Sequence, residues 1–173
     1  MLDGFLLKAA QMIQEGADII DMGAQSTRPG AEMIDIDKEL NQLLPYITGL
    51  KKAYPNQLIS VDTFNPIVAE EVLKAGAHII NDISGASFDQ DILKVISKHN
   101  AGYIGMHING SFSTMHEVHQ SKDIIDSIIE YIQDKKKLLA SFGITKWVMD
   151  PGFGFGKTVQ ENFDIIKRLK ELK

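Results

Sequence analysis

Five short apolar runs along the chain each end on a polar residue, and this pattern predicts a parallel sheet. Runs rich in Ile and Val are typical of strands that are covered on both faces. The runs are Ala17–Asp21, Leu58–Asp62, His78–Asp82, Tyr103–His107 and Trp147–Asp150. In parallel α/β folds the active site lies at the carboxyl ends of the strands. We therefore expect the following polar side chains to converge on one rim: Asp21, Asp62, Asn81, His107 and Asp150.

Helical patterns alternate with these runs. The first spans Phe5–Glu15, where apolar residues recur three and four positions apart, and Gly16 follows as a C-cap. Four residues are predicted to begin further helices: Asp37, Asn65, Asp89 and Asp123. We expect these helices over Lys38–Tyr54, from Pro66 to Gly76, from Asp89 towards His99 and from Asp123 to near Gly143, with a last one over Gln160–Leu172.

The alternation of helix and strand leaves two architectures, a doubly wound sheet and a (β/α)8 barrel. A weak repeat, EGADIIDMG at 15–23 and AGAHIINDISG at 75–85, marks the repeating αβ step. The G-x-G-x-x-G phosphate fingerprint of a doubly wound sheet is absent, and polar residues end every run rather than one switch point, which favours the barrel. A complete barrel needs about 250 residues. We therefore expect residues 1–173 to form a single α/β domain, a partial TIM barrel of five βα units.

Composition and charge are ordinary for a globular protein. The formal net charge of −5 argues against a general nucleic-acid binder, which needs clustered Lys and Arg. No apolar stretch approaches the roughly 18–20 residues of a membrane span, and the first residues lack the basic start of a signal peptide. The sequence contains no cysteine, which excludes a thiolate metal site and is compatible with a reducing cytoplasm, where we place the protein.

Two glycine-rich segments follow predicted strands. In Met22–Gly30, glycines flank Ser26, Thr27 and Arg28, so the loop could hold an anion, although an ordinary βα loop has a similar composition. In DPGFGFGKT at 150–158, alternating glycines and phenylalanines would let the backbone pass close to a flat ligand under an aromatic cover. This segment is not a P-loop, because proline stands where that motif needs glycine.

Acceptor side chains at three strand ends point to a ligand rich in N–H donors. Any one of Asp62, Asn81 and Asp150 could simply organise a loop or cap a helix. Several acceptors aimed at one pocket would repel one another without a ligand, whereas carboxylates and an amide can pair with the two-donor edge of a guanidine-like heterocycle. We favour substrate recognition for the three together.

The remaining histidines are weaker candidates. His116-Glu117-Val118-His119 lacks one residue of the zinc motif H-E-x-x-H, so we expect no metal site there. His78 and His99 are expected at the surface or at helix ends, and Trp147 in the core.

Together these segments resemble dihydropteroate synthase, the pterin-binding (β/α)8 enzyme of folate biosynthesis. The matching segments are ADIIDMGAQSTRPGA (17–31), ISVDT (59–63), IINDISG (79–85), MHING (106–110) and DPGFGFGKT (150–158). The resemblance implies a transferase and sulfonamide target that condenses p-aminobenzoate with 6-hydroxymethyl-7,8-dihydropterin diphosphate, releasing diphosphate. It also implies Mg²⁺ as cofactor, small-molecule substrates with no nucleic-acid or membrane partner, and a homodimer of the full-length enzyme.

The resemblance assigns roles residue by residue. Asp62, Asn81 and Asp150 match the positions that hold the pterin ring. Met106 and Phe155 match the apolar walls of that pocket. Thr27 and Arg28 match a mobile loop that orders p-aminobenzoate and the diphosphate, and Asp21 matches an organising carboxylate. We assign catalytic roles to two of these residues, Asp62 and Arg28.

Some family features differ or lie elsewhere. Gln25 stands where the family often has Glu, and Phe112 where proline is usual. The first strand, with an asparagine that meets Mg²⁺, is expected before Met1, and two basic motifs after Lys173, so these residues alone are expected to be inactive. Two alternatives remain: the pterin-binding domain of a corrinoid methyltransferase, and a non-catalytic pterin-binding module.

Overall fold

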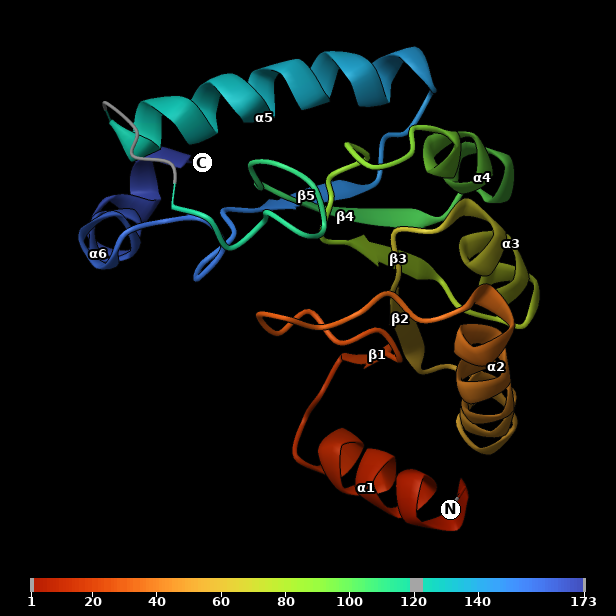
Figure 1. Ribbon diagram of the computed structural model, residues 1–173. Coiled ribbons are helices and arrows are strands. Elements are labelled where there is room, and N and C mark those ends of the chain that lie inside the picture. The colour runs from red at the N-terminus through yellow and green to blue at the C-terminus, as the bar shows by residue number, and fades with distance from the viewer. Residues whose placement is uncertain (1, 119–122, 173) are drawn as a thin grey trace.

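The computed structural model describes residues 2–118 and 123–172, in which helices and strands alternate throughout (Figure 1). The strands are β1 (Ile19–Gly23), β2 (Leu58–Asp62), β3 (Ile79–Asp82), β4 (Gly102–Met106) and β5 (Trp147–Asp150). The helices are α1 (Leu2–Gln14), α2 (Ile36–Ala53), α3 (Pro66–Lys74), α4 (Asp91–His99), α5 (Ile124–Ser141) and α6 (Val159–Arg168), which continues into a 3-10 helix, η1 (Leu169–Leu172). Each predicted strand and helix is present.

The order of the strands decides between the two architectures. All five pair in parallel in the order β1-β2-β3-β4-β5, which is also their order in the sequence. In a doubly wound sheet, the order of the strands would reverse at a switch point. Helices α2, α3 and α4 follow one another along the same side of the sheet (Figure 1), as in the outer layer of a barrel. The prediction of a partial barrel is confirmed.

The core lies between the sheet and these helices. Its central side chains are fully buried: Ile47, Leu50, Ile59, Val61, Val68, Ile80, Ile92 and Ile96. The opposite face of the sheet carries apolar residues that are exposed, with Ile19 at 40%, Leu58 at 42% and Val148 at 63%. The expectation of cover on both faces is therefore wrong for the described residues. The apolar residues on the second face suit the interior of a closed barrel, which is filled by layers of side chains.

The first strand and helix α2 begin elsewhere than predicted. Strand β1 starts at Ile19 and ends at Gly23, which puts Asp21 in mid-strand. Helix α2 begins at Ile36 because Asp35 is its N-cap, with Asp35 Oδ1 accepting from the Asp37 amide at 2.9 Å. The prediction of Asp37 as the cap is wrong.

The other helix starts agree more closely. Asn65 caps α3 and Asp123 caps α5, as predicted. Gln90 occupies the N-cap position of α4, although Asp89 Oδ1 still accepts from the Asp91 amide at 2.9 Å. Gly16, with a φ of 98°, follows α1 as expected.

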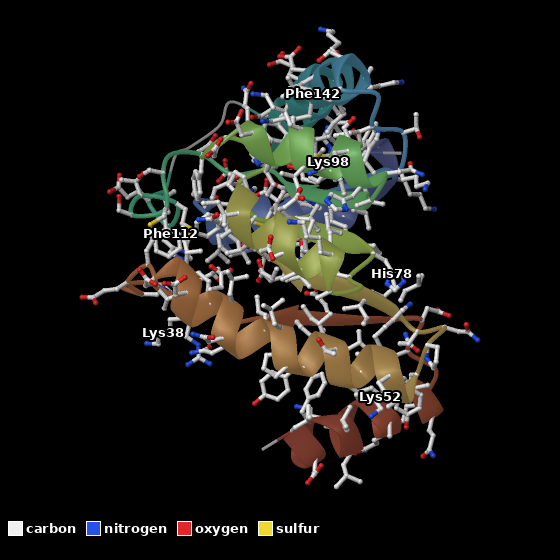
Figure 2. All side chains as sticks on the ribbon, turned by 90° about the vertical axis from the view of Figure 1, so that its right-hand side faces the viewer. Lys38, Lys52, His78, Lys98, Phe112 and Phe142 are labelled. Atoms are coloured by element: carbon white, nitrogen blue, oxygen red, sulfur yellow. The ribbon has the colours of Figure 1, made fainter. Side chains whose placement is uncertain are left out.

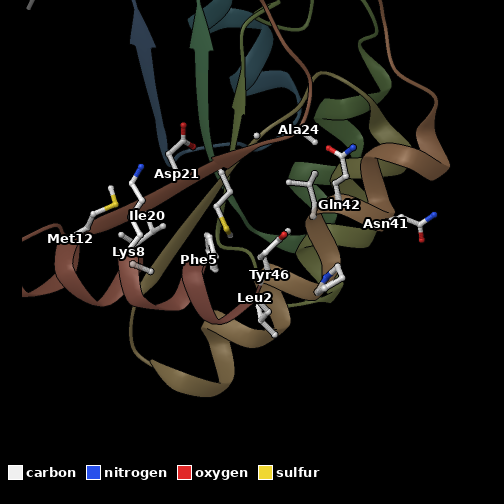
Figure 3. Close-up of a pocket in the computed structure, with 15 residues that line it drawn as sticks. Leu2, Phe5, Lys8, Met12, Ile20, Asp21, Ala24, Asn41, Gln42 and Tyr46 are labelled. Carbon is white, nitrogen blue, oxygen red and sulfur yellow. The ribbon is translucent and has the colours of Figure 1, made fainter.

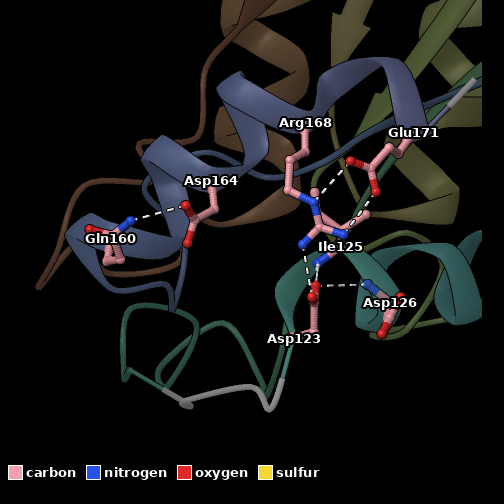
Figure 4. A network of polar contacts seen from close by, with 7 residues as sticks. All are labelled: Asp123, Ile125, Asp126, Gln160, Asp164, Arg168 and Glu171. Carbon is pink, nitrogen blue, oxygen red and sulfur yellow. Dashed lines mark hydrogen bonds and ion pairs between the residues drawn. The ribbon is translucent and has the colours of Figure 1, made fainter.

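Ion pairs join neighbouring helices at the surface. Arg168 Nη1 lies 2.8 Å from Asp123 Oδ2, so the residue that caps α5 also anchors the end of α6 (Figure 4). Lys98 and His99 of α4 contact Glu70 of α3, and Lys98 is labelled on the outer face in Figure 2.

His78 is half-buried and its Nδ1 accepts from the Ile59 amide. Trp147 packs half-buried against the core. None of the helices in residues 2–118 and 123–172 is long and apolar enough to cross a membrane.

Candidate functional site

The acceptor side chains lie on the face of the sheet that the helices leave open. Within each strand, alternate residues point to opposite faces. Asp21, Asp62, Asn81 and Asp150 share strand positions with the exposed Ile19, Leu58 and Val148, whereas Ile20, Ile59, Val61 and Ile80 face the helices. Gly23 pairs with Asp62, and Asp62 with Asn81, so the last two are direct neighbours at the carboxyl end. Four of the five predicted rim residues are thus on one face.

Asp62 sits in a confined position beside Gly23. A Cβ atom built on Gly23 would lie 3.0 Å from the Asp62 Cβ, so a larger residue there would press on the Asp62 side chain. Burial raises the pKa of Asp62 to about 7, and the nearby charges of Asp21, Asp82 and Glu39 add to this effect. A carboxylate in this state is stabilised by a ligand that brings N–H donors or positive charge.

Asn81 is held by Asp21. Its side-chain nitrogen donates to Asp21 Oδ2 at 3.3 Å. This contact uses one of the two amide hydrogens and orients the amide, and the side-chain oxygen is then an acceptor for a ligand. Asp21 thus contacts a second predicted site residue, and its organising role stays a prediction.

Asp82 organises the loop after β3 from the opposite face of the sheet. It is fully buried and accepts from the Ser84 amide at 2.8 Å, the Ala86 amide at 2.7 Å and Tyr103 Oη at 2.9 Å. Gly85 has a φ of 57°, and a Cβ there would collide with Tyr131 Oη. The sequence reasoning missed this role of Asp82, although Asp-x-Ser-Gly after a strand is a turn signal.

His107 does not join the rim. It follows β4 directly, and its side chain is 2% exposed, with its ring edge-on to Tyr131 of α5 at 5.0 Å. Burial, with the charge of Lys157, lowers the pKa of His107 to about 4, so the ring is neutral. The expectation that His107 converges with the acceptors is wrong, because the residue after Met106 faces the helices.

The glycine-rich loop after β5 is fixed by its own polar side chains. Asp150 Oδ1 accepts from the Gly152 amide at 2.7 Å. Lys157 Nζ donates to the carbonyl oxygens of His107 at 3.2 Å, Gly152 at 2.8 Å and Phe155 at 3.1 Å. Lys157 is 7% exposed, and burial lowers its pKa to about 8. The lysine is therefore part of the loop's framework, unlike the lysine of a P-loop.

An apolar cluster lies at the same end of the sheet. Its buried members are Ile83, Met106, Ile108 and Met115, and Phe64, Phe88, Phe112 and Phe155 pack against them. Met106 and Phe155, predicted as pocket walls, are thus in one cluster. Phe112, which replaces a proline usual in the resembling family, contacts Phe64 with ring centroids 5.6 Å apart.

The loop after β1 is held together by Gln25. Its Nε2 donates to the carbonyls of Ser26 at 2.8 Å and Glu32 at 3.0 Å, and its Oε1 accepts from the Ile34 amide at 2.8 Å. A glutamate could not make the two donor contacts, so glutamine suits this loop. Arg28 is exposed at its tip, while the Thr27 carbonyl contacts His116.

A cavity of about 850 Å³ lies elsewhere, between α1, β1 and α2 (Figure 3). Its lining is mainly apolar and includes Leu2, Phe5, Met12 and Tyr46, and Asp21 also lines it. It includes none of Asp62, Asn81, Asp150 or Phe155. We therefore place the candidate site on the open face of the sheet and not in this cavity.

Within the described residues, no group of three His, Asp or Glu side chains could hold a metal ion. His119 of the H-E-V-H segment lies outside those residues.

The sequence matches, over residues 1–173, a family model described as pterin binding enzyme. The chain belongs to this family. A dihydropteroate synthase from Synechocystis is 40% identical over 168 residues, which cover 96% of this chain and 58% of that protein. The acceptor row, formed by Asp21, Asp62, Asn81 and Asp150, and the apolar cluster thus lie in a chain that belongs to the pterin-binding family.

Solved structures agree with the family assignment. The dihydropteroate synthase from Yersinia pestis, solved with a sulfonamide drug, superposes with a TM-score of 0.93 at 33% identity, over 99% of this chain and 62% of that one. The Clostridium difficile enzyme, solved in the presence of pteroic acid, gives 0.91 at 38%, over 99% and 64%. The chain spans less than two thirds of each of these relatives.

Proposed function

We propose that this chain forms the pterin-binding part of a dihydropteroate synthase. The observation that carries the proposal is the pair formed by Asp62 and Asn81 at the end of the sheet. The two residues are adjacent in register, the pKa of Asp62 is raised to about 7, and Asp21 orients the Asn81 amide. Two neighbouring acceptors match the N–H donor edge of a pterin.

Asp150 and the apolar cluster complete the proposed pocket. Asp150 ends β5 on the same face, and Met106 is paired with it in register. Phe155 would cover the flat ring while the carboxylates hold its edge. Pteroic acid, present with the Clostridium difficile relative, joins a pterin to p-aminobenzoate, which supports a site for both halves.

The proposed reaction is a substitution at the pterin methylene carbon. The bond from this carbon to the diphosphate oxygen breaks, and a new bond forms to the amine of p-aminobenzoate, which loses a proton. Positive character grows on the methylene as diphosphate leaves, and the Asp62 carboxylate stabilises it. Thr27 and Arg28, in the loop beside the rim, would order p-aminobenzoate and the anionic leaving group.

Mg²⁺ and the homodimer belong to the proposal by family resemblance alone, and the cytoplasmic location belongs to it because the sequence contains no cysteine. The described residues offer no group that fits a resident metal ion, and we propose no step through one.

Calorimetric titration of the chain with 6-hydroxymethylpterin tests the pterin site. Asp62→Asn is expected to weaken binding by about 2–4 kcal/mol, and Asp150→Asn similarly, because buried N–H groups of the ligand lose a charged acceptor. Asp134→Asn, on the exposed face of α5, is the control and should leave the affinity unchanged. Unchanged affinity in both site variants would refute the assignment, and methyl transfer from methyltetrahydrofolate would favour the corrinoid methyltransferase instead.

A further inference from the structure

We infer that His116 is a positioning residue that ties the Thr27–Arg28 loop to the aromatic wall of the site. The inference rests on the proposed function, since it assigns a task within the same rim. His116 Nε2 lies 2.8 Å from the carbonyl oxygen of Thr27. The same ring stacks on Phe155, with centroids 5.2 Å apart and planes 23° from parallel.

The hydrogen bond fixes which nitrogen carries a proton. A carbonyl oxygen can only accept, so His116 Nε2 is the donor. This condition holds for the neutral Nε2–H tautomer and for the imidazolium alike. The contact therefore serves to hold the position of the loop.

Three loops meet at this one side chain. His116 belongs to the loop after β4, Thr27 to the loop after β1, and Phe155 to the loop after β5. Gln25 holds the first of these loops together internally, whereas the bond to His116 connects it to another part of the molecule.

The segment around His116 is held in place by the residues on both sides of it. The preceding Met115 is 1% exposed within the apolar cluster. The following residue, Glu117, lies so close to the loop after β5 that a Cβ on Gly156 would be 2.9 Å from its carbonyl oxygen. His116 thus projects from an anchored segment, and it sets where Thr27 and Arg28 lie relative to Phe155.

Two substitutions separate the two contacts. His116→Phe keeps a ring to stack on Phe155 but loses the donor, and His116→Gln keeps a donor but loses the ring. Glu117→Gln, at the exposed neighbouring side chain, is the matched control. Amide hydrogen exchange over residues 25–34 reports on the loop, and titration with 6-hydroxymethylpterin reports on the wall.

The two variants are expected to affect different measurements. H116F accelerates exchange over residues 25–34 by about fivefold or more, since a hydrogen bond is lost, and leaves pterin affinity within twofold. H116Q leaves loop exchange within twofold of the native chain but weakens pterin binding by about threefold, since the stacked ring that supports Phe155 is lost. E117Q changes neither quantity.

Unchanged loop exchange in H116F, or acceleration in H116Q equal to that in H116F, would overturn the inference. Exchange of the buried strand amides of Ile59 and Ile80 shows whether each variant is folded. If H116F also loses protection at these strand amides, His116→Ala replaces it in the test. Loop exchange in His116→Ala is then compared with loop exchange in H116Q. A native chain that binds no pterin would refute the proposed function, while the exchange results would still decide whether His116 holds the loop.

Discussion

The chemistry of Asp62 is set by residues that come from four different elements. Gly23 of β1 leaves room for its side chain, and its own strand end places it beside Asn81. Burial raises its pKa, and the carboxylates of Asp21, Asp82 and Glu39 raise it further. An anion held under these conditions is costly in the free protein. A ligand with N–H donors relieves that cost, so binding and deprotonation of Asp62 favour each other.

Replacing Asp62 by Asn is expected to flatten the pH dependence of stability. The folded-state pKa of about 7 lies above the ordinary aspartate value of 3.8. Between these values the folded state keeps a proton that the unfolded state releases, so stability is full below pH 4 and is lost as the pH rises through 7. We expect Asp62 to cost about 1–3 kcal/mol at pH 8 relative to pH 4, a cost that Asn lacks. Urea unfolding of both proteins at several pH values measures it.

His107 has the opposite effect on the pH dependence of stability, so it must be present in both proteins that are compared. Its pKa is lowered to about 4, so it makes stability rise with pH from about 4 to its ordinary value of 6.5. Both proteins contain His107, and its contribution cancels in their difference. Parallel stability curves for the native chain and D62N would contradict the pKa assigned to Asp62.

The sequence places Asp62, Asn81 and Asp150 at one edge of the sheet because the strand ends of a parallel sheet share an edge. It does not place His107 correctly, since adjacent residues of an extended segment point to opposite faces and an error of one residue reverses the assignment. The contact between His116 and Thr27 could not be predicted from the sequence either, because it joins residues 89 positions apart. Periodicity carries no information on such loop contacts.

At the scale of elements, helix and strand identity followed from hydrophobic spacing, but the start of α2 did not. Asp35 and Asp37 both suit an N-cap, and both precede the apolar pattern. The structure selects Asp35, whose side chain accepts from the Asp37 amide at 2.9 Å. The sequence does not decide between two such nearby capping residues, because the choice depends on how the preceding loop enters the helix.

Alanine substitutions at these two aspartates are expected to differ. Asp35→Ala should lower the free energy of unfolding by about 1 kcal/mol, since the first turn of α2 loses its capping acceptor. Asp37→Ala removes only a favourable charge in the first turn, worth about 0.3–0.5 kcal/mol. Thermal or urea unfolding compares the two directly. A larger loss in Asp37→Ala than in Asp35→Ala would show that Asp37 is the cap after all.

At the scale of the whole molecule, the sheet presents one covered face and one open face. The covered face packs on helices in the order expected for a barrel. The open face carries both the acceptor row and the exposed Ile19, Leu58 and Val148, while β1 and β5 form the two edges of the sheet. Sequence order and parallel pairing could be predicted because each αβ step is local. The open face could not, since a continuous apolar run reads the same whether or not a second layer covers it.

The 173 residues alone are expected to catalyse the condensation poorly. The second face of the sheet is open to water, which weakens the stabilisation that the carboxylates can give to positive character on the methylene carbon as diphosphate leaves. Arg28 is exposed at a loop tip, and Lys157 is buried in its own loop, where three carbonyl oxygens occupy its ammonium group. Lys157 is therefore not placed to hold a leaving anion, and Arg28 would have to do so from an exposed loop, so the rate should suffer more than pterin affinity. The comparison is with a chimera in which this chain replaces the matching 58% of the Synechocystis relative, assayed for dihydropteroate formation with both substrates and Mg²⁺. We expect the chain alone to be slower by about a hundredfold or more, whereas turnover within about tenfold of the chimera would show that the open face already forms a complete site.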